Sequence, residues 1–277
     1  MTKPEVLSSP ANPLLKDVRK AIVRGGLTEG GFWVAETFHL LEEALRSDMD
    51  VKVVLASESV HSAVESHIRR LNGPRLAVIP DPLFARLAGT ETTQGVIALV
   101  RPPNWTLEQL FRGRTLLVVL DGLQDPGNAG AVVRSAEAFG ASGVLFLKGT
   151  ASPYHPKTLR ASAGSLFRVP FVAGLDSTLV RAALKQNRLE VYATAPRSDS
   201  GSKLIGQVDL TRRCAIILGS EGRGVSQTLR SAALDLSTPT TGVESLNAAV
   251  AAGIVLYEAR RQRSASRTGA RAVPEEA

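Results

Sequence analysis

The chain of 277 residues is poor in the side chains that build disulfide-linked or metal-stabilised proteins. It has one cysteine, Cys214, which excludes an intramolecular disulfide framework and a cysteine metal cluster. Cys214 begins the apolar run 214–218, so we expect it to be buried as a small hydrophobic side chain. His39, His61 and His67 lack metal-ligand spacing with acidic or sulfur partners, so no metal is expected.

The chain also lacks long apolar stretches and the common catalytic signatures. No apolar run approaches the ~20 residues that span a bilayer, and the first residues lack the apolar core of a signal peptide, which predicts a cytoplasmic protein. The absence of GxxxxGK[ST], GxSxG and HExxH argues against P-loop nucleotide binding, serine hydrolases of the nucleophile-elbow type and zinc hydrolases. No GxGxxG opens a helix after the strand expected at 116–120, which disfavours a Rossmann dehydrogenase.

The composition does supply a hydrophobic core and an excess of basic charge. Hydrophobic residues make up 44% of the chain, enough for one large or two moderate domains. A net charge of +7 favours a polyanionic partner. Lys16, Arg19, Lys20 and Arg24 lie close together and suggest a basic face, whereas residues 264–277 predict a disordered basic tail that either contacts phosphate or keeps the protein soluble.

Alternating helix and strand signals predict two α/β domains, at 1–100 and 115–263, joined by a linker at 101–114. In the first domain, a basic helix ends at Gly25-Gly26, further helices are expected at 37–46, 61–71 and 82–87, and strands at 32–35, 51–57, 76–79 and 95–100. In the second, strands are expected at 116–120, 144–147, 167–172, 190–195 and 214–218, a helix or turn at 157–165, and helices at 129–139, 177–187 and 245–262.

The stretch 116–147 predicts a strand, a loop, a helix and a returning strand. Such a unit places polar residues at the carboxyl end of a parallel strand, where open α/β sheets bind ligands. Asn128 is expected to cap the helix by accepting from its first-turn N–H groups. Arg134 projects from that helix, and taken alone it is compatible with an ordinary solvated arginine.

Three glycine- or turn-rich loops follow strands of the second domain, at 121–130, 219–224 and 237–247. Loops at one sheet edge form a pocket, and glycines let backbone groups approach a ligand closely. Each loop alone, GSEGRG at 219–224 included, is also compatible with an ordinary turn.

Together, in this order and spacing, the loops resemble the SpoU/TrmH family of the SPOUT superfamily, which are S-adenosylmethionine-dependent RNA ribose 2′-O-methyltransferases. The first motif is DPGNAGAVVRSAEAFG with Asn128 and Arg134, the second is ILGSEGRGVS with Glu221, and the third is VESLNAAVAAGI with Ser245, Leu246 and Asn247. Residues 8–100 resemble the family's substrate-binding domain, which is similar to ribosomal protein L30e, so the resemblance covers nearly the whole chain.

The resemblance implies an α/β protein with an N-terminal L30e-like domain and a C-terminal SPOUT domain, whose chain is threaded into a deep trefoil knot. It also implies S-adenosyl-L-methionine as cofactor, RNA as partner, no membrane and no metal. A homodimer through the C-terminal domain is implied as well, although the last helix is equally compatible with an intramolecular core helix.

The family's motifs carry site residues onto this chain. The implied cofactor contacts are Thr194, Ala195, Gly219, Glu221, Leu236, Leu246 and Asn247. The implied catalytic group is Arg134, Asn128, Glu221, Ser245 and Asn247, and the RNA-binding candidates are Lys16, Arg19, Lys20, Arg24 and Arg160. We interpret Arg134 as orienting the 2′-hydroxyl and the adjoining phosphate, because a guanidinium with a pKa above ~12 is costly to neutralise. Glu221 either favours the sulfonium or holds its loop, and we favour the second role.

Two positions depart from the family pattern. The segment 236–242 lacks the methionine of the family's Ile-Pro-Met and is shorter than the family's segment by one residue, so it departs from the pattern at the cofactor contacts of 236–239. Glu36-Thr37 replaces the family's Glu-Gly, so the family's turn is not assured there.

We therefore predict an RNA 2′-O-ribose methyltransferase that acts on ribosomal RNA of the 23S type. The preference over transfer RNA depends on the separate N-terminal domain, which resembles domains on rRNA enzymes of the family. The alternatives are a tRNA 2′-O-methyltransferase and a catalytically silent RNA-binding assembly factor, and the intact motif residues argue against the latter.

Overall fold

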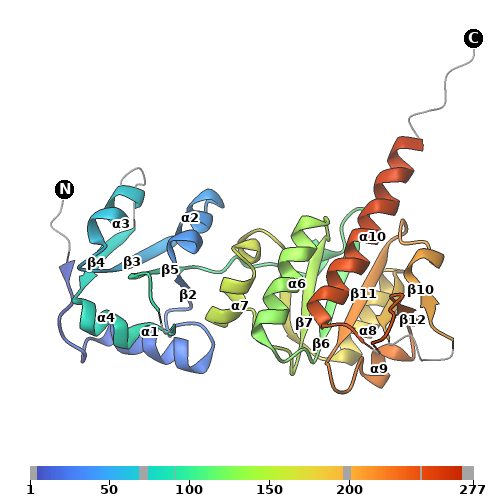
Figure 1. Ribbon diagram of the computed structural model, residues 1–277, viewed down its shortest axis with the longest axis horizontal. Coiled ribbons are helices and arrows are strands. Elements are labelled where there is room, and N and C mark those ends of the chain that lie inside the picture. Colours follow the sequence, from blue (N-terminus) through green and yellow to red (C-terminus); the bar gives the residue numbers. More distant parts are fainter. Residues whose placement is uncertain (1–4, 69–73, 91, 196–200, 244, 270–277) are drawn as a thin grey trace, which may run out of the picture. The chain divides into compact units, whose positions relative to one another are not determined.

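The structure, a computed structural model, describes residues 5–68, 74–90, 92–195, 201–243 and 245–269. Its contacts divide the chain into a first unit, Met1–Asn104 with Ser152–Arg168, and a second unit, Trp105–Ala151 with Val169–Ala277. Each unit contains its own sheet (Figure 1). The last residues, 270–277, which include the tail arginine Arg271, lie outside the described part of the chain.

The first unit is built on a mixed sheet that has five strands in its described residues, in the order β1-β4-β3-β5-β2. The strands are β1 (Glu5–Val6), β2 (Trp33–Glu36), β3 (Val51–Ser57), β4 (Arg75–Ile79) and β5 (Val96–Val100). The helices are α1 (Pro13–Arg24), α2 (Phe38–Arg46), α3 (His61–Ile68), α4 (Asp81–Leu87) and α7 (Pro156–Ala161), and η1 (Ser165–Phe167) is a 3-10 turn. The end of the helix expected at 61–71 lies outside the described residues.

Helix α1 has clear start and stop signals. The Asn12 side chain accepts a hydrogen bond from the Leu14 N–H at 2.9 Å, and proline occupies the first helical position, where no N–H is needed. Gly25 ends the helix in the left-handed conformation, with φ of 66°. The buried face of α1 packs into the core of the first sheet, which leaves its basic residues on the exposed side.

Helix α2 begins at an unusual backbone position. Thr37 has φ of 128° and ψ of 151°, a conformation that favours glycine, yet its hydroxyl accepts from the Leu40 N–H at 3.2 Å. The turn is therefore made despite the side chain that occupies the family's glycine position.

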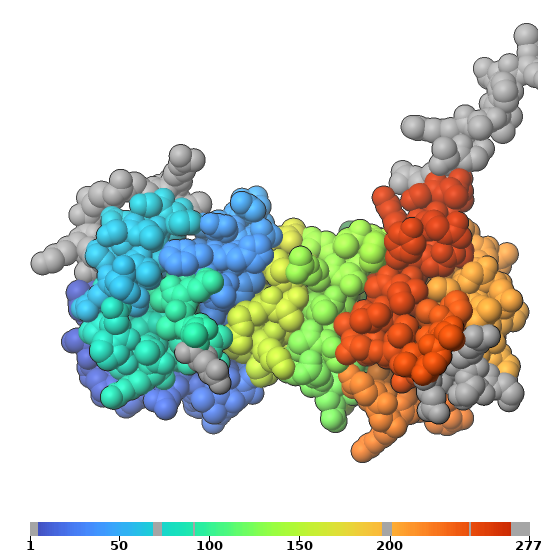
Figure 2. Space-filling view, viewed as in Figure 1, coloured from blue at the N-terminus to red at the C-terminus, as the bar shows by residue number. Residues whose placement is uncertain are grey.

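The segment Ser152–Arg168, which the sequence assigned to the second domain, packs with the first unit. It packs against the edge strand β2, all four residues of which are buried. In Figure 2 its yellow-green atoms lie against blue and teal atoms of the first unit. Trp33 donates from its Nε1 to the Pro153 carbonyl at 3.2 Å, and its ring lies 5.6 Å from that of Phe167. This packing covers an otherwise open sheet edge.

The second unit is built on a sheet of seven strands among its described residues, all pairing parallel, in the order β10-β12-β9-β11-β6-β7-β8. The strands are β6 (Leu116–Asp121), β7 (Gly143–Leu147), β8 (Phe171–Leu175), β9 (Glu190–Thr194), β10 (Lys203–Leu204), β11 (Cys214–Gly219) and β12 (Leu234–Ser237). The helices are α5 (Leu107–Leu110), α6 (Pro126–Ala138), α8 (Ser177–Gln186), α9 (Gln227–Arg230) and α10 (Ala248–Gly269), and η2 (Ile205–Gln207) is a 3-10 turn.

The central strands are buried on both faces, as unbroken apolar runs in a parallel sheet require. Helices α8 and α9 contribute to the core on one face, and α6 packs against α10. Cys214 is fully buried, and that burial raises the pKa of its thiol to about 11. The order of the strands changes direction between β6 and β11, because β7 and β8 lie on one side of this point and β9 to β12 lie on the other. The carboxyl ends of β6 and β11 meet where Gly219 pairs with Asp121.

Three sequence expectations were wrong in their bounds. The strand expected at 167–172 begins at Phe171, because η1 and Pro170 precede it. The residues 101–114 are not a free linker throughout, since Leu110 and Phe111 are buried in the core of the second unit. The last helix starts at Ala248 instead of 245 and continues to Gly269, so residues 264–269 are helical. The knot implied by the resemblance stays a prediction.

Candidate functional site

Helix α6, which contributes Asn128 to the site, has an N-cap residue other than the expected one. Asp125, not Asn128, is the N-cap, and its Oδ1 accepts from the Asn128 N–H at 2.7 Å. Pro126 fits at the first helical position because that position needs no N–H. Asn128 therefore lies inside the first turn, where its side chain is free of capping and is available to other loops.

Three motif side chains form a continuous hydrogen-bond chain. Asn128 donates from Nδ2 to Glu221 Oε1 at 2.8 Å, and Asn247 donates from Nδ2 to Asn128 Oδ1 at 3.1 Å. Asn247 also caps α10, since its Oδ1 accepts from the Ala249 N–H at 2.9 Å. The loop after β6, the loop after β11 and the start of α10 are thereby joined through side-chain amides. Ser245, the cap considered from the sequence, precedes this turn.

The loop after β11 is a tight reversal that only glycine permits at its first position. Ser220 and Gly224 exchange two backbone hydrogen bonds, of 3.1 and 2.9 Å. A Cβ on Gly219 would lie 2.1 Å from the carbonyl carbon of Gly224. Asp121 at the end of β6 holds the far side of the loop, because its Oδ2 accepts from the Ser226 N–H at 2.7 Å.

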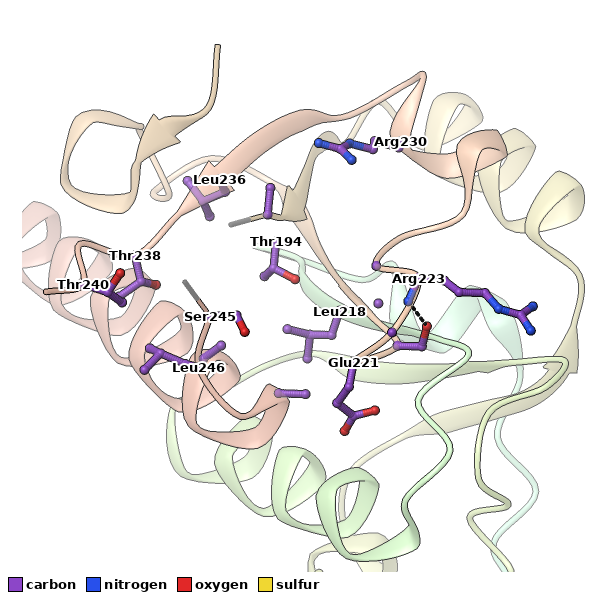
Figure 3. Close-up of a pocket in the computed structure, with 17 residues that line it drawn as sticks. Thr194, Leu218, Glu221, Arg223, Arg230, Leu236, Thr238, Thr240, Ser245 and Leu246 are labelled. Carbon is purple, nitrogen blue, oxygen red and sulfur yellow. Dashed lines mark hydrogen bonds between the residues drawn. The ribbon is translucent and has the colours of Figure 1, made fainter. Parts of the chain in front are cut away.

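A pocket of about 500 Å³ opens beside this loop, within the second unit (Figure 3). Its apolar walls include Leu218, Leu236 and Leu246, and the hydroxyls of threonine and serine side chains lie among them. In Figure 3 the Glu221 side chain extends toward α6, whereas Arg223 extends away from the other labelled side chains. The lining residues are Thr194, Ala195, Leu218, Gly219, Ser220, Glu221, Gly222, Arg223, Gly224, Arg230, Leu236, Thr238, Thr240, Ser245, Leu246, Ala248 and Ala251.

The pocket floor is held by the ends of the strands. Thr194 donates from its hydroxyl to the Ile217 carbonyl at 3.2 Å, which ties β9 to β11. The Ala195 N–H donates to the Leu236 carbonyl at 3.0 Å, which ties β9 to β12. Apolar walls with a few fixed polar groups are the usual composition of a small-molecule site, and the volume lies in the usual range of ~300–1,000 Å³.

The structure brings most of the expected site residues together. Thr194, Ala195, Gly219, Glu221, Leu236, Ser245 and Leu246 all line the pocket. Asn128 and Asn247 lie outside its lining but connect to Glu221. Arg134 is exposed on α6 and is not among the lining residues.

Several lining residues were missed by the sequence analysis. Thr238 and Thr240 stand in the segment that departs from the family pattern, so no motif pointed to them. Ala248 and Ala251 occur within the quoted third motif, and their helical spacing places them one turn apart on the same face of α10. That spacing was the available signal.

The RNA-binding candidates divide into two groups. Lys16, Arg19, Lys20 and Arg24 are all exposed on α1. Arg160 instead forms an ion pair with Glu36, a carboxylate side chain that is only 5% exposed. The other oxygen of Glu36 accepts from the Gly89 N–H at 2.6 Å. Removal of Arg160 would leave a buried charge without its ion partner, so Arg160 contributes to the packing of the first unit, and its contact with RNA stays a prediction.

Two searches of the described residues for other sites were negative. No group of three or more His, Cys, Asp or Glu side chains in them is placed to hold a metal ion. Likewise, none of the helices in the described part of the chain is long and apolar enough to cross a membrane.

Comparison with known families and proteins places these features in context. A model described as the SpoU rRNA Methylase family matches residues 115–257, and one described as an MRM3-like substrate binding domain matches residues 12–98. The chain is 34% identical, over 92% of its length and 98% of the other protein, to the 23S rRNA (guanosine(2553)-2′-O)-methyltransferase RlmP of Bacillus subtilis (strain 168).

Two further relatives extend the comparison. The 23S rRNA (guanosine-2′-O-)-methyltransferase RlmB of Nitrosomonas europaea is 35% identical over 84% of this chain and 92% of its own. Among solved structures, the SpoU methyltransferase AviRb from Streptomyces viridochromogenes in complex with the cofactor AdoMet superposes with a TM-score of 0.77. The two chains are 26% identical, and the match covers 92% of this chain and 100% of the AviRb chain.

Proposed function

The chain belongs to the SpoU rRNA methylase family, and from this membership we propose that it transfers a methyl group from S-adenosylmethionine to a ribose 2′-hydroxyl of ribosomal RNA. The observation that carries the proposal is the joining of three motif loops at one pocket, through the hydrogen-bond chain of Asn247, Asn128 and Glu221. An accessory protein that had lost catalysis would have no need to keep this chain intact.

The pocket suits the cofactor in shape and chemistry. Leu218, Leu236 and Leu246 offer an apolar slot for a flat adenine ring, and the backbone of the strand ends offers donors and acceptors at its rim. The Glu221 carboxylate mainly holds its loop through the hydrogen bond from Asn128, and because it also lines the pocket its negative charge would favour a positive sulfonium. When bound, S-adenosylmethionine supplies an electrophilic methyl group for in-line displacement.

Asn128 and Asn247 act on the geometry of the site. The Glu221 carboxylate is an exposed group that accepts from the Asn128 amide, so its direction is set by α6. Asn247 fixes the orientation of that amide, because its own Nδ2 donates to the amide oxygen. Positioning of this kind supports catalysis by keeping loops in a single arrangement.

Arg134 is assigned to the RNA. It is exposed on α6, six residues beyond Asn128, and no hydrogen bond or ion pair within the described residues occupies its guanidinium. A planar guanidinium can hold a phosphate oxygen and the neighbouring 2′-hydroxyl together, which aligns the nucleophile without requiring the arginine to lose its proton. Ser245, at the pocket edge, is available as a second hydroxyl donor to RNA or cofactor.

The other proposed partners are inferred from exposed residues of α1 and α10. The exposed basic residues of α1 form a face for RNA phosphates, with the exposed Val23 among them. Val250 and Tyr257 are exposed apolar residues of α10, which favours burial of this helix in a homodimer. The cytoplasm is the compartment that such a substrate implies.

The test is methyl transfer in vitro. Labelled S-adenosylmethionine is incubated with total rRNA and, separately, total tRNA, and the digested RNA is analysed for 2′-O-methylated nucleosides. We expect labelled nucleoside from rRNA, and we expect Arg134→Lys to lose most activity although it keeps the charge, because Lys cannot make the bidentate contact. Near-normal turnover by Arg134→Lys would contradict the assigned role, and label in tRNA alone would overturn the choice of substrate.

A further inference from the structure

A second cavity of the second unit, of about 280 Å³, is surrounded by arginine. Its lining residues are Arg114, Phe139, Gly140, Arg260 and Arg263, with no acidic side chain among them. It shares no residue with the pocket at the strand ends. A concentration of positive charge around one open hollow raises the question of which negative group balances it.

The cavity lies at the opposite end of the sheet from the cofactor pocket. Arg114 precedes β6, and Asp121 ends it, so the six residues of that strand separate the two ends by about 20 Å. The helix α10 gives an independent measure. Ala248 lines the first pocket and Arg260 the second, and twelve helical residues correspond to about 18 Å. The two sites are therefore separate but are joined by one rigid helix.

Arg263 supplies charge, and most of its donors are already used within the protein. Its side chain is buried, and its guanidinium donates to the carbonyls of Leu210 at 2.8 Å, Arg114 at 2.8 Å, Thr115 at 3.1 Å and Arg212 at 2.5 Å. These partners are neutral, and no carboxylate among the described residues pairs with it. These hydrogen bonds use four of the five N–H donors and leave the full positive charge in place.

Arg114 and Arg260 supply the donors. Both are exposed, and the Nη2 group of Arg114 makes long bonds of 3.3 Å to the Thr211 carbonyl and the Ser266 hydroxyl. Its remaining groups, and the whole guanidinium of Arg260, have no hydrogen-bond or ion-pair partner in the described part of the chain.

The nearby end of α6 does not balance this charge. The helix ends at Ala138, next to the cavity residues Phe139 and Gly140. Its carbonyl end is equivalent to about half a negative charge. Three guanidiniums thus leave an excess of about 2.5 positive charges, which attracts an oxyanion with several acceptor oxygens.

We propose that Arg114, Arg260 and Arg263 form a phosphate-binding site remote from the cofactor pocket. The group bound is a tetrahedral phosphate, and RNA backbone is the source that we favour, because Arg114 and Arg260 are exposed and can reach the phosphates of a polyanion. The choice of RNA rests on the proposed function. In this role α10 spans the distance between the RNA contact and the site of methyl transfer.

The test uses the full-length Arg114→Gln/Arg260→Gln double variant, since Arg263 is too buried to replace without loss of the fold. The matched control is Arg181→Gln/Lys185→Gln, which removes the same charge from exposed positions of α8 in the same unit. One arm measures binding of a labelled 20-nucleotide RNA of mixed sequence over a range of salt. A second arm measures thermal stabilisation by inorganic phosphate at constant ionic strength.

We expect the arginine variant to bind RNA about tenfold more weakly than the control variant at low salt, and to lose about 0.7 from the salt slope for each contact removed. If only the phosphate arm separates the two variants, the anion site stands and its ligand is free phosphate. Equal behaviour of the two variants in both arms overturns the proposal. A change of oligomeric state in the arginine variant alone, measured by light scattering, also overturns it, because the cluster would then be an interface.

S-adenosylmethionine affinity provides the check on the separation of sites. It should be equal in the wild type and both variants, and a loss confined to the arginine variant would contradict a site some 20 Å away. The RNA arm needs no chemistry. Binding by the wild type without methyl transfer would therefore refute the proposed function while leaving this inference intact.

Discussion

Replacement of Thr37 by glycine should stabilise the first unit, although it removes a helix cap. The Thr37 backbone has φ of 128°, where a side chain costs about 1–3 kcal/mol. Against that relief, glycine at an N-cap costs only a few tenths of a kcal/mol relative to threonine, and its added freedom in the unfolded chain costs about 0.5–1 kcal/mol. The net effect is a gain of about 1 kcal/mol in the free energy of unfolding.

Thr37→Ala separates strain from capping. Alanine keeps the Cβ at the same φ and loses the hydroxyl that accepts from the Leu40 N–H, so it should cost about 1 kcal/mol. The two variants therefore differ by about 2 kcal/mol, in opposite directions from the wild type. Without the backbone argument, both substitutions would simply remove a cap, and both would destabilise.

The assay is urea unfolding of the full-length protein, followed by tryptophan fluorescence. A Trp105→Phe background leaves Trp33 as the reporter, and Trp33 is fully buried in the first unit. The background change should be mild, because the Trp105 indole N–H is buried without a partner within the described residues. A Thr37→Gly variant that unfolds at the same urea concentration as Thr37→Ala, or a lower one, would refute the reasoning.

Three further outcomes are expected. Gly219→Ala should weaken S-adenosylmethionine binding by more than tenfold in calorimetry, because its Cβ would overlap backbone, whereas Gly222→Ala, with open space around it, should bind normally. Asn128→Asp should raise the cofactor Kd about fivefold, because it replaces a hydrogen-bond donor with a charge that repels Glu221 by about 1 kcal/mol at an exposed site. An unchanged Kd would show that this contact has no influence on cofactor binding. Burial, with nearby basic residues, lowers the pKa of His155, so the free energy of unfolding should fall as the pH drops below ~6.5. The variant His155→Asn keeps a capping oxygen but does not titrate, so it should flatten that part of the pH profile of unfolding.

Sequence patterns predicted the parts of the fold that depend on local chemistry. The apolar runs of β6, β7 and β11 could only be buried strands of a parallel sheet, and they are. The first two loops were expected at one sheet edge because they follow β6 and β11, and the pocket lies there. The Asp125-Pro126 pair also carried a signal that was overlooked, since an acidic cap followed by proline is a common start of a helix.

Features that depend on distant partners were out of reach. Arg160 looked like one more basic residue, because nothing local reveals a buried Glu36 that lies 124 positions earlier in the chain. Strand β12 is a short Leu-Asp-Leu-Ser alternation whose strand character comes from its pairing with β9 and β10. The bonds from Asn247 through Asn128 to Glu221 likewise form only once three separate loops have been placed by the sheet.

The placement of Ser152–Arg168 in the first unit has a consequence for biosynthesis. Residues up to Asn104 leave the ribosome first, but the segment that covers β2 and Trp33 is completed only about 60 residues later, a delay of roughly 3–12 s at ~5–20 residues per second. During that interval the nascent chain presents an open strand edge beside a large indole, the kind of surface that chaperones recognise. The first unit therefore cannot be completed until residue 168 has been synthesised, although its other residues end at Asn104.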